Sequence, residues 1–188
     1  PVICQRLVRK LVEKGLCRLK AIAWTYLDDV LMAARTRRRA AQAYRRVTRV
    51  LRKAGFIINE GKSVSEPQRE MEFVGKIIDT RSRTIRNKQG TLIAATRAWL
   101  KAIAKRWIGK KQARSMLGKI GWATRPSGGA GAFVAGAHAT LTKAEQSDGD
   151  VDFGSKLAKA VGTAIMLAHV PHKFEPASTK GWTFFFRA

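Results

Sequence analysis

Tyr26-Leu27-Asp28-Asp29 is the most informative stretch of this chain, because two adjacent carboxylates stand between two short apolar runs, residues 21–24 and 30–34. The runs predict two strands, and the four residues predict a tight β-hairpin turn between them. Two like charges so close together repel each other, and a hairpin turn needs only a single Asp or Asn with Gly. A divalent cation held by both carboxylates explains the pair best. An ordinary polar turn is the alternative.

The 188-residue chain carries a large excess of positive charge, with 37 Lys and Arg against 13 Asp and Glu and a formal net charge of +24. Such an excess repels itself and favours a polyanionic partner, most commonly nucleic acid. The length and the 45% hydrophobic content are those of a folded protein of one or two domains. No apolar run approaches the length of a membrane span, so we expect an intracellular protein, nuclear or cytoplasmic, without a membrane partner.

The hydrophobic pattern predicts an α+β fold, in which antiparallel hairpins with packed helices precede a mainly helical part. The expected helices cover residues 2–14, 38–54, 92–103, 113–120, 132–143 and 151–168. Further strands are expected at residues 56–58, at 182–186 and in a second hairpin made of 71–78 and 84–86, with its turn at Arg81 and Ser82. Gly15 and Gly55 are expected to end the first two helices, and residues 126–131 to form a loop.

The order of the motifs resembles that of the reverse transcriptases of retroelements, in which Tyr26-Leu27-Asp28-Asp29 corresponds to the catalytic hairpin. Pro1-Val2-Ile3-Cys4-Gln5 resembles the end of the preceding motif. Leu51-Arg52-Lys53-Ala54-Gly55-Phe56 through Asn59-Glu60-Gly61-Lys62-Ser63 resembles the palm motif that follows. Phe73-Val74-Gly75-Lys76-Ile77-Ile78 resembles the hairpin that grips the primer end. Residues 115–123 are similar to thumb and connection helices, and residues 177–182 are similar to the first strand of a ribonuclease H domain.

The resemblance implies three parts: residues 1–88 as the C-terminal part of a polymerase palm, 89–170 as a helical thumb and connection, and 171–188 as the truncated start of a ribonuclease H-like strand. Two departures limit it. The family needs a third catalytic carboxylate upstream of Gln5, and the first Asp of this chain is Asp28. Pro176 stands where the ribonuclease H strand normally has an Asp. We therefore expect an incomplete or degenerate piece of an RNA-directed DNA polymerase that is inactive alone.

By the same resemblance, Asp28 and Asp29 are the expected catalytic ligands of Mg²⁺ or Mn²⁺, and Lys62 assists the departing pyrophosphate. In the intact parent, the partners would be an RNA or DNA primer-template and a deoxynucleoside triphosphate. Lys62 could also be a plain surface lysine. The residues expected to contact the primer or other nucleic acid are Tyr26, Gln5, Phe73, Val74, Gly75, Lys76, Lys110, Lys111 and Arg114.

Basic residues on two predicted helices are further candidates for phosphate contacts. They are the arginines of residues 38–53 and the Lys and Arg side chains at 101, 105, 106, 110, 111 and 114. The arginines at 38–53 are nearly as well explained as the solvated side of an amphipathic helix. Trp99, Trp107 and Trp122 are expected in the core, and Cys4 and Cys17 as buried thiols. A non-catalytic basic nucleic-acid-binding protein, of ribosomal type or a domesticated polymerase remnant, and a purely structural helical protein are the alternative functions.

Overall fold

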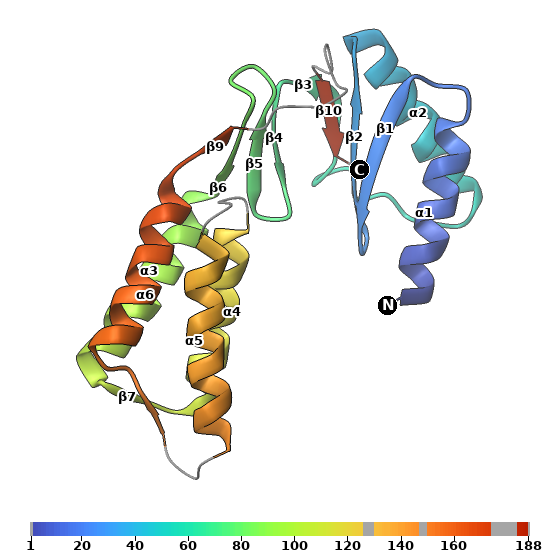
Figure 1. The fold of residues 1–188 in the computed structure, drawn as a ribbon. Helices are drawn as coiled ribbons and strands as arrows, with labels where there is room; N and C mark the ends of the chain where they lie inside the picture. The colour runs from blue at the N-terminus through green and yellow to red at the C-terminus, as the bar shows by residue number, and fades with distance from the viewer. Residues whose placement is uncertain (1, 126–129, 147–149, 174–183, 188) are drawn as a thin grey trace. The chain divides into compact units, whose positions relative to one another are not determined.

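The chain folds into two compact units, each with a core of its own. The computed structural model describes residues 2–125, 130–146, 150–173 and 184–187. Residues 1–84 and 173–188 form the first unit, and residues 85–172 form the second (Figure 1). The division lies a few residues before the boundary that the sequence predicts at residue 88.

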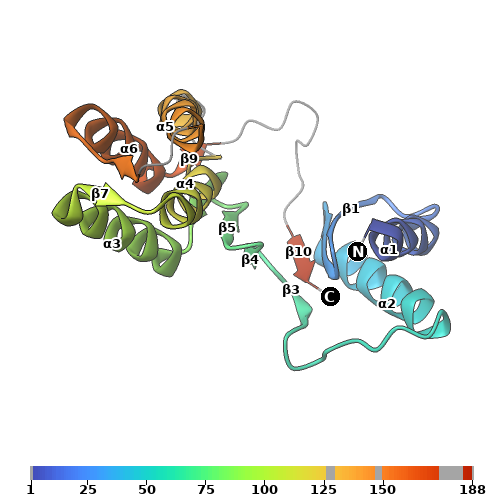
Figure 2. The ribbon, with the colours of Figure 1, turned by 90° about the horizontal axis from the view of Figure 1, so that it is seen from below.

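The first unit contains two helices that cover one face of an antiparallel sheet of order β1-β2-β10-β3 (Figures 1 and 2). Its elements are α1 (Val2–Leu16), β1 (Ala21–Tyr26), β2 (Asp29–Ala34), α2 (Arg37–Lys53), β3 (Val64–Gln68), β4 (Glu70–Phe73), β5 (Lys76–Asp79) and β10 (Phe184–Arg187). β4 and β5 form a separate hairpin. β6 (Thr84–Asn87) and β9 (His172–Lys173) lie at the boundary between the units.

Strand β2 is apolar along its length because it is buried on both faces. Its side chains alternate between the faces, as strand geometry requires. Val30 and Met32 contact the core formed with α1 and α2, whereas Leu31 and Ala33 contact Met71 of the β4–β5 hairpin. The apolar run that the sequence shows at residues 30–34 therefore serves two cores, and it holds the hairpin that carries Asp28 and Asp29 between them.

Gly15 does not end its helix, as the sequence analysis expects; α1 runs on to Leu16. The glycine is buried where α1 crosses α2, and a Cβ atom at position 15 would lie 2.9 Å from Val47 Cγ2 and 3.0 Å from Val47 Cα. The missing side chain thus permits a close approach of the two helices. Gly55, by contrast, follows α2 with a φ of +88° and has the role that the sequence predicts.

Gly15→Ala should lower the unfolding free energy of the first unit, because the backbone of Val47 must move to admit the methyl group. We expect a loss of about 1–3 kcal/mol, the usual cost of overpacking a core. Urea denaturation measures it. Gly136→Ala on α5 is the matched control, since its added Cβ meets no atom within 4 Å and should stabilise that helix. A stabilising effect of Gly15→Ala would contradict the close contact.

The second unit is a set of four helices with one short two-stranded ladder, within residues 85–125, 130–146 and 150–172. The helices are α3 (Gln89–Lys105), α4 (Lys110–Thr124), α5 (Ala130–Glu145) and α6 (Ser155–His169), and the strands are β7 (Trp107–Ile108) and β8 (Val151–Asp152). In Figure 2, α5 is seen nearly end-on and α3 from the side. Met116, Leu117 and Ile120 of α4 lie in the shared core with Val134 and Val161.

The α+β class is confirmed, and several local predictions are wrong. Residues 56–58 form no strand, and Ile57 is 98% exposed. The chain reverses at Val74 and Gly75, within the run 71–78 expected as one strand, in addition to the turn that precedes β6.

Other corrections concern the second half of the chain and three side chains. Residues 130–131, expected in a loop, belong to α5, and Val151 and Asp152, expected in a helix, form β8. Residues 126–129 lie outside the described residues, as do 182 and 183 of the expected last strand. Trp107, Cys4 and Cys17 are exposed, whereas Trp99 packs against the core. No described helix is long and apolar enough to cross a membrane.

Candidate metal and nucleic-acid site

The predicted hairpin with the two carboxylates is present, and its turn is as short as a hairpin allows. β1 and β2 pair from Ala21 opposite Ala34 to Tyr26 opposite Asp29, so only Leu27 and Asp28 connect them. Leu27 has a φ of +53°, in the left-handed region that side chains other than glycine adopt at a cost of about 1–2 kcal/mol. Such strain concentrates at functional sites. The turn therefore places Leu27, the residue directly before Asp28, in a strained conformation.

The two carboxylates differ in their surroundings. Asp28 is exposed at the tip, whereas Asp29 is half-buried as the first residue of β2 and lies directly opposite Tyr26. Residues opposite each other in an antiparallel ladder share a face, so Tyr26 and Asp29 lie on the face with Trp24 and Leu31. The Tyr26 and Trp24 side chains are 45% and 47% exposed. The tip thus combines carboxylates with accessible aromatic surface.

The β4–β5 hairpin lies on this same face of the sheet. Phe73 pairs with Lys76 across the turn formed by Val74 and Gly75, whose φ values of +50° and +72° have the sign of a type I′ turn. Met71 and Phe73 contact the cluster that contains Leu31. The structure therefore brings the predicted primer-contacting hairpin and the face with Tyr26 and Asp29 together in one unit, with Lys76 buried.

Gln5 and Lys62 lie elsewhere in the first unit. Gln5 is half-buried on α1 and lines a groove of about 530 Å³ together with Trp24 and Thr25 of β1. Lys62 is an exposed residue in a turn, and its amide donates to the backbone oxygen and to Oδ1 of Asn59, both at 3.2 Å. These hydrogen bonds fix the backbone position of Lys62. The role of its ammonium group stays a prediction.

The carboxylate pair has the donor chemistry of a magnesium site but not a full set of ligands. Mg²⁺ prefers hard oxygen ligands in an octahedral shell, and carboxylates supply such oxygens. Within the described ranges, no group of three His, Cys, Asp or Glu side chains is placed to hold a metal ion. Asp28 and Asp29 therefore fit part of a metal site, and further ligands have to come from substrate, water or other residues.

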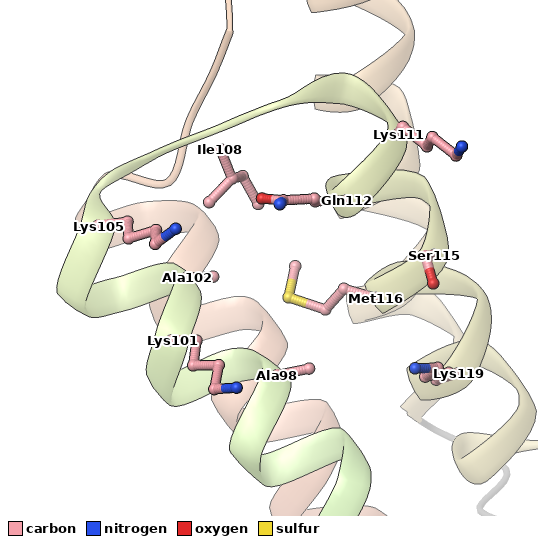
Figure 3. A pocket seen from close by; sticks show the side chains of 10 residues that line it. All are labelled: Ala98, Lys101, Ala102, Lys105, Ile108, Lys111, Gln112, Ser115, Met116 and Lys119. Atoms are coloured by element: carbon pink, nitrogen blue, oxygen red, sulfur yellow. The ribbon is translucent and has the colours of Figure 1, made fainter.

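A second candidate site lies in the second unit, between α3 and α4. A groove of about 510 Å³ has an apolar floor that includes Ala102, Ile108 and Met116, and lysines around it. The lysines are Lys101 and Lys105 of α3 and Lys111 and Lys119 of α4. In Figure 3, the Lys101, Lys105 and Met116 side chains point into the space between the two helices, and Lys111 points away from it.

Of the basic residues predicted to contact nucleic acid, Lys110, Lys111 and Arg114 all lie on the first turns of α4. Only Lys111 lines the groove. Cations at the N-terminus of a helix are disfavoured by the helix dipole, so their accumulation there is not explained by helix stability. Residues 80–144 contain no Asp or Glu. Sequence reasoning noted the basic residues but missed this complete absence of acid, which is readable from the sequence.

Residues 1–78 match the family model of the reverse transcriptases (RNA-dependent DNA polymerases). The matched segment runs from the start of the chain through the carboxylate hairpin, α2 and most of the β4–β5 hairpin. These 78 of the 188 residues are thus similar to part of a reverse transcriptase. A comparison with curated proteins found no significant match.

Proposed function

We propose that the first unit is the C-terminal half of a reverse transcriptase palm, which adds deoxynucleotides to a primer 3′ end. The observation that carries the proposal is the packing of the β4–β5 hairpin on the sheet face that bears Tyr26 and Asp29. A polymerase must hold a primer end next to its metal ligands, and this packing places two suitable hairpins on one face. The family match to residues 1–78 supports the same conclusion.

Each side chain has a proposed task in this reaction. Divalent metal ions in such a site activate the primer hydroxyl and neutralise charge on the triphosphate. Asp28 is the metal ligand at the tip, and Asp29 supports it from the start of β2. The backbone of Val74 and Gly75, with Phe73, holds the primer end. Tyr26 and Gln5 contact the strand nearby, and Lys62 neutralises the leaving pyrophosphate.

The metal site in this proposal is completed by a third carboxylate from outside the chain described here. Two carboxylates cannot hold two metal ions, so we expect this chain to be inactive by itself and to become active only as part of a complete polymerase domain. Mg²⁺ or Mn²⁺ would be the cofactor. Primer extension on an RNA template, with and without the divalent ion, tests the function. Synthesis that does not depend on a divalent ion would contradict it.

The alternative function is a basic nucleic-acid-binding protein without catalysis, and the lysine-rimmed groove between α3 and α4 favours it. Binding of this kind falls with salt, needs no Mg²⁺ and survives Asp28→Asn. A polymerase also has to hold its nucleic acid through contacts of basic residues with phosphates, so salt-dependent binding is expected of both functions. Measuring DNA synthesis by Asp28→Asn therefore distinguishes the two functions, whereas measuring binding does not.

Lys101→Gln combined with Lys105→Gln should weaken binding of a primer-template duplex in a salt-dependent way. If both lysines contact phosphates, the slope of log K against log salt should become shallower by about 1.8, or 0.9 per contact. Fluorescence anisotropy over a salt series measures it. Lys156→Gln with Lys159→Gln on α6 removes the same charge from exposed positions outside the groove. Equal slopes for the two double variants would exclude the groove as a phosphate site.

A further inference from the structure

Helix α2 carries an unusual stack of positive charge. Eight of its seventeen residues are Arg or Lys and none is acidic. Arg45, Arg49 and Lys53 are spaced four residues apart, so they lie one above another along the helix at intervals of about 6 Å. Like charges at this spacing destabilise a helix. Within the described residues these three cations form no ion pair. The binding of an external anion therefore explains the stack better than a role as a solvated surface does.

The stack borders a groove of about 690 Å³ within the first unit. One wall is α2, which contributes Tyr44, Arg45, Thr48, Arg49, Arg52 and Lys53, and the other contains Glu60, Ser63 and Ser65. The second wall is shaped by the turn at Asn59, whose backbone oxygen accepts hydrogen bonds from the amide and the hydroxyl of Ser63 at 2.9 and 2.8 Å. These two hydrogen bonds fix the backbone of the second wall.

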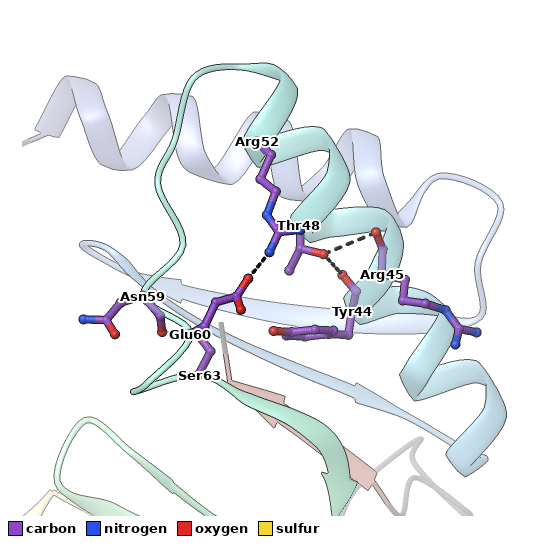
Figure 4. Close-up of polar contacts among 7 residues, drawn as sticks. All are labelled: Tyr44, Arg45, Thr48, Arg52, Asn59, Glu60 and Ser63. Atoms are coloured by element: carbon purple, nitrogen blue, oxygen red, sulfur yellow. Dashed lines mark hydrogen bonds and ion pairs between the residues drawn. The ribbon is translucent and has the colours of Figure 1, made fainter.

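Glu60 is the acidic residue among those that line this groove, and it forms an ion pair with Arg52. Glu60 Oε1 accepts a hydrogen bond from Arg52 Nη2, and Figure 4 shows the Arg52 side chain reaching from α2 to Glu60. The Tyr44 ring lies on the same side of the helix. Burial, and secondarily the charge of Glu60, raises the pKa of the Tyr44 hydroxyl, so this group stays a neutral hydrogen-bonding group at physiological pH. Arg45, Arg49 and Lys53 remain as the uncompensated charge of the groove.

We propose that this groove binds the phosphodiester backbone of a single nucleic-acid strand, at a site separate from the sheet face that carries Tyr26 and Asp29. A single row of cations about 6 Å apart follows one strand and does not span the two strands of a duplex. Glu60 limits the affinity of the site because it holds Arg52. The site does not depend on the proposed polymerase activity, because none of its residues belongs to the carboxylate hairpin or the β4–β5 hairpin.

Arg45→Gln with Arg49→Gln in the full chain tests the stack, with a short fluorescent oligothymidylate as the probe. Loss of two phosphate contacts should make the salt slope shallower by about 1.4, which corresponds to about 25-fold weaker binding at about 0.1 M salt. Arg38→Gln with Arg39→Gln is the matched control: it removes the same charge from exposed positions of the same helix outside the groove. Equal losses for both pairs would overturn the proposal, because they would show a general effect of charge.

Glu60→Gln tests the proposal through a gain of binding, which a purely structural role of this segment would not produce. The substitution frees Arg52 for one more phosphate, so oligothymidylate should bind about fivefold tighter at about 0.1 M salt. Glu66→Gln is the matched control, since Glu66 is also exposed and pairs with Arg37 of the same helix at 3.1 Å but does not line the groove. Unchanged or weaker binding by Glu60→Gln, or an equal gain by Glu66→Gln, would overturn the proposal.

Binding to phosphatidylserine vesicles tests whether the groove recognises the phosphates of a lipid surface instead of those of a nucleic-acid strand. If the variants change binding to vesicles but leave binding of oligothymidylate as it was, the groove recognises an anionic lipid surface and the proposal is wrong. Hydrogen exchange gives an independent location: the strand should protect amides in residues 45–53 and 59–65. Protection confined to the β1–β2 and β4–β5 hairpins, or to the second unit, would also overturn it.

Discussion

Asn87→Asp should strongly destabilise the second unit. The Asn87 side chain is buried, and its Nδ2 donates to the carbonyl oxygens of Ala123 at 2.9 Å and Ala168 at 2.7 Å. These carbonyls belong to the last turns of α4 and α6, so the Asn87 amide links the two helix ends. A carboxylate removes both donors and places a negative charge against two carbonyl oxygens.

The expected cost is roughly 2–6 kcal/mol, since the substitution breaks two hydrogen bonds at a buried site and each such loss costs about 1–3 kcal/mol. That is a large fraction of the 5–15 kcal/mol that stabilises a typical domain. Urea denaturation followed by circular dichroism measures it. Acid should restore part of the stability, because a protonated carboxyl can donate one hydrogen bond and burial raises the pKa of such a group. The stability of the variant should therefore fall as the pH rises through that pKa.

Asn59→Asp is the matched control for this prediction. Its Oδ1 only accepts a hydrogen bond from the amide of Lys62, and a carboxylate oxygen accepts equally well. The same chemical change at an exposed turn should leave the unfolding free energy within about 0.5 kcal/mol of the parent. If Asn87→Asp were equally mild, the amide would not be the link between the two helix ends.

The hairpin at Tyr26 and the four helices of the second unit were predictable, because their patterns are local. Alternation around two adjacent acids indicates a turn, and apolar positions such as Met116 and Ile120 repeat at helical spacing. Gly15 was misjudged because a glycine looks the same in sequence at a helix end and at a helix crossing. Only the position of Val47, which is distant in sequence, distinguishes the two.

The groove beside α2 could not be read from the sequence for a similar reason. Arginine spacing was visible, but the wall formed by Glu60 and Ser63 depends on how the chain returns after α2. The strand predicted at residues 56–58 is absent although the run is apolar. Phe56 packs against the core, but its backbone does not pair with another strand. The aromatic run near the end does form a strand, β10, between β2 and β3, a pairing that no local pattern indicates.

Asp28→Asn should remove nearly all DNA synthesis by the complete polymerase domain that carries this segment. Asn keeps the size of the side chain but loses the charge that a metal ligand needs. We expect a fall of about 1,000-fold, equivalent to roughly 4 kcal/mol of transition-state stabilisation supplied through the metal. Asp29→Asn should cost less, about 10–100-fold, because a supporting group orients the metal site and does not form it.

Stability and binding should be nearly unaffected by Asp28→Asn, because the side chain is exposed at the tip of the hairpin. Salt-dependent binding of a primer-template should persist, since it depends on the basic residues. This contrast separates a polymerase from a protein that only binds nucleic acid. Glu66→Gln removes the same charge from an exposed position of β3 and should leave synthesis unchanged.

Single-nucleotide primer extension on an RNA template, across a series of Mg²⁺ concentrations, is the most direct test of the proposed metal site at Asp28. We expect metal-dependent extension by the parent, a loss of about 1,000-fold in Asp28→Asn and full activity in Glu66→Gln. Extension by Asp28→Asn at the rate of the parent would contradict the assignment of this hairpin as the catalytic centre.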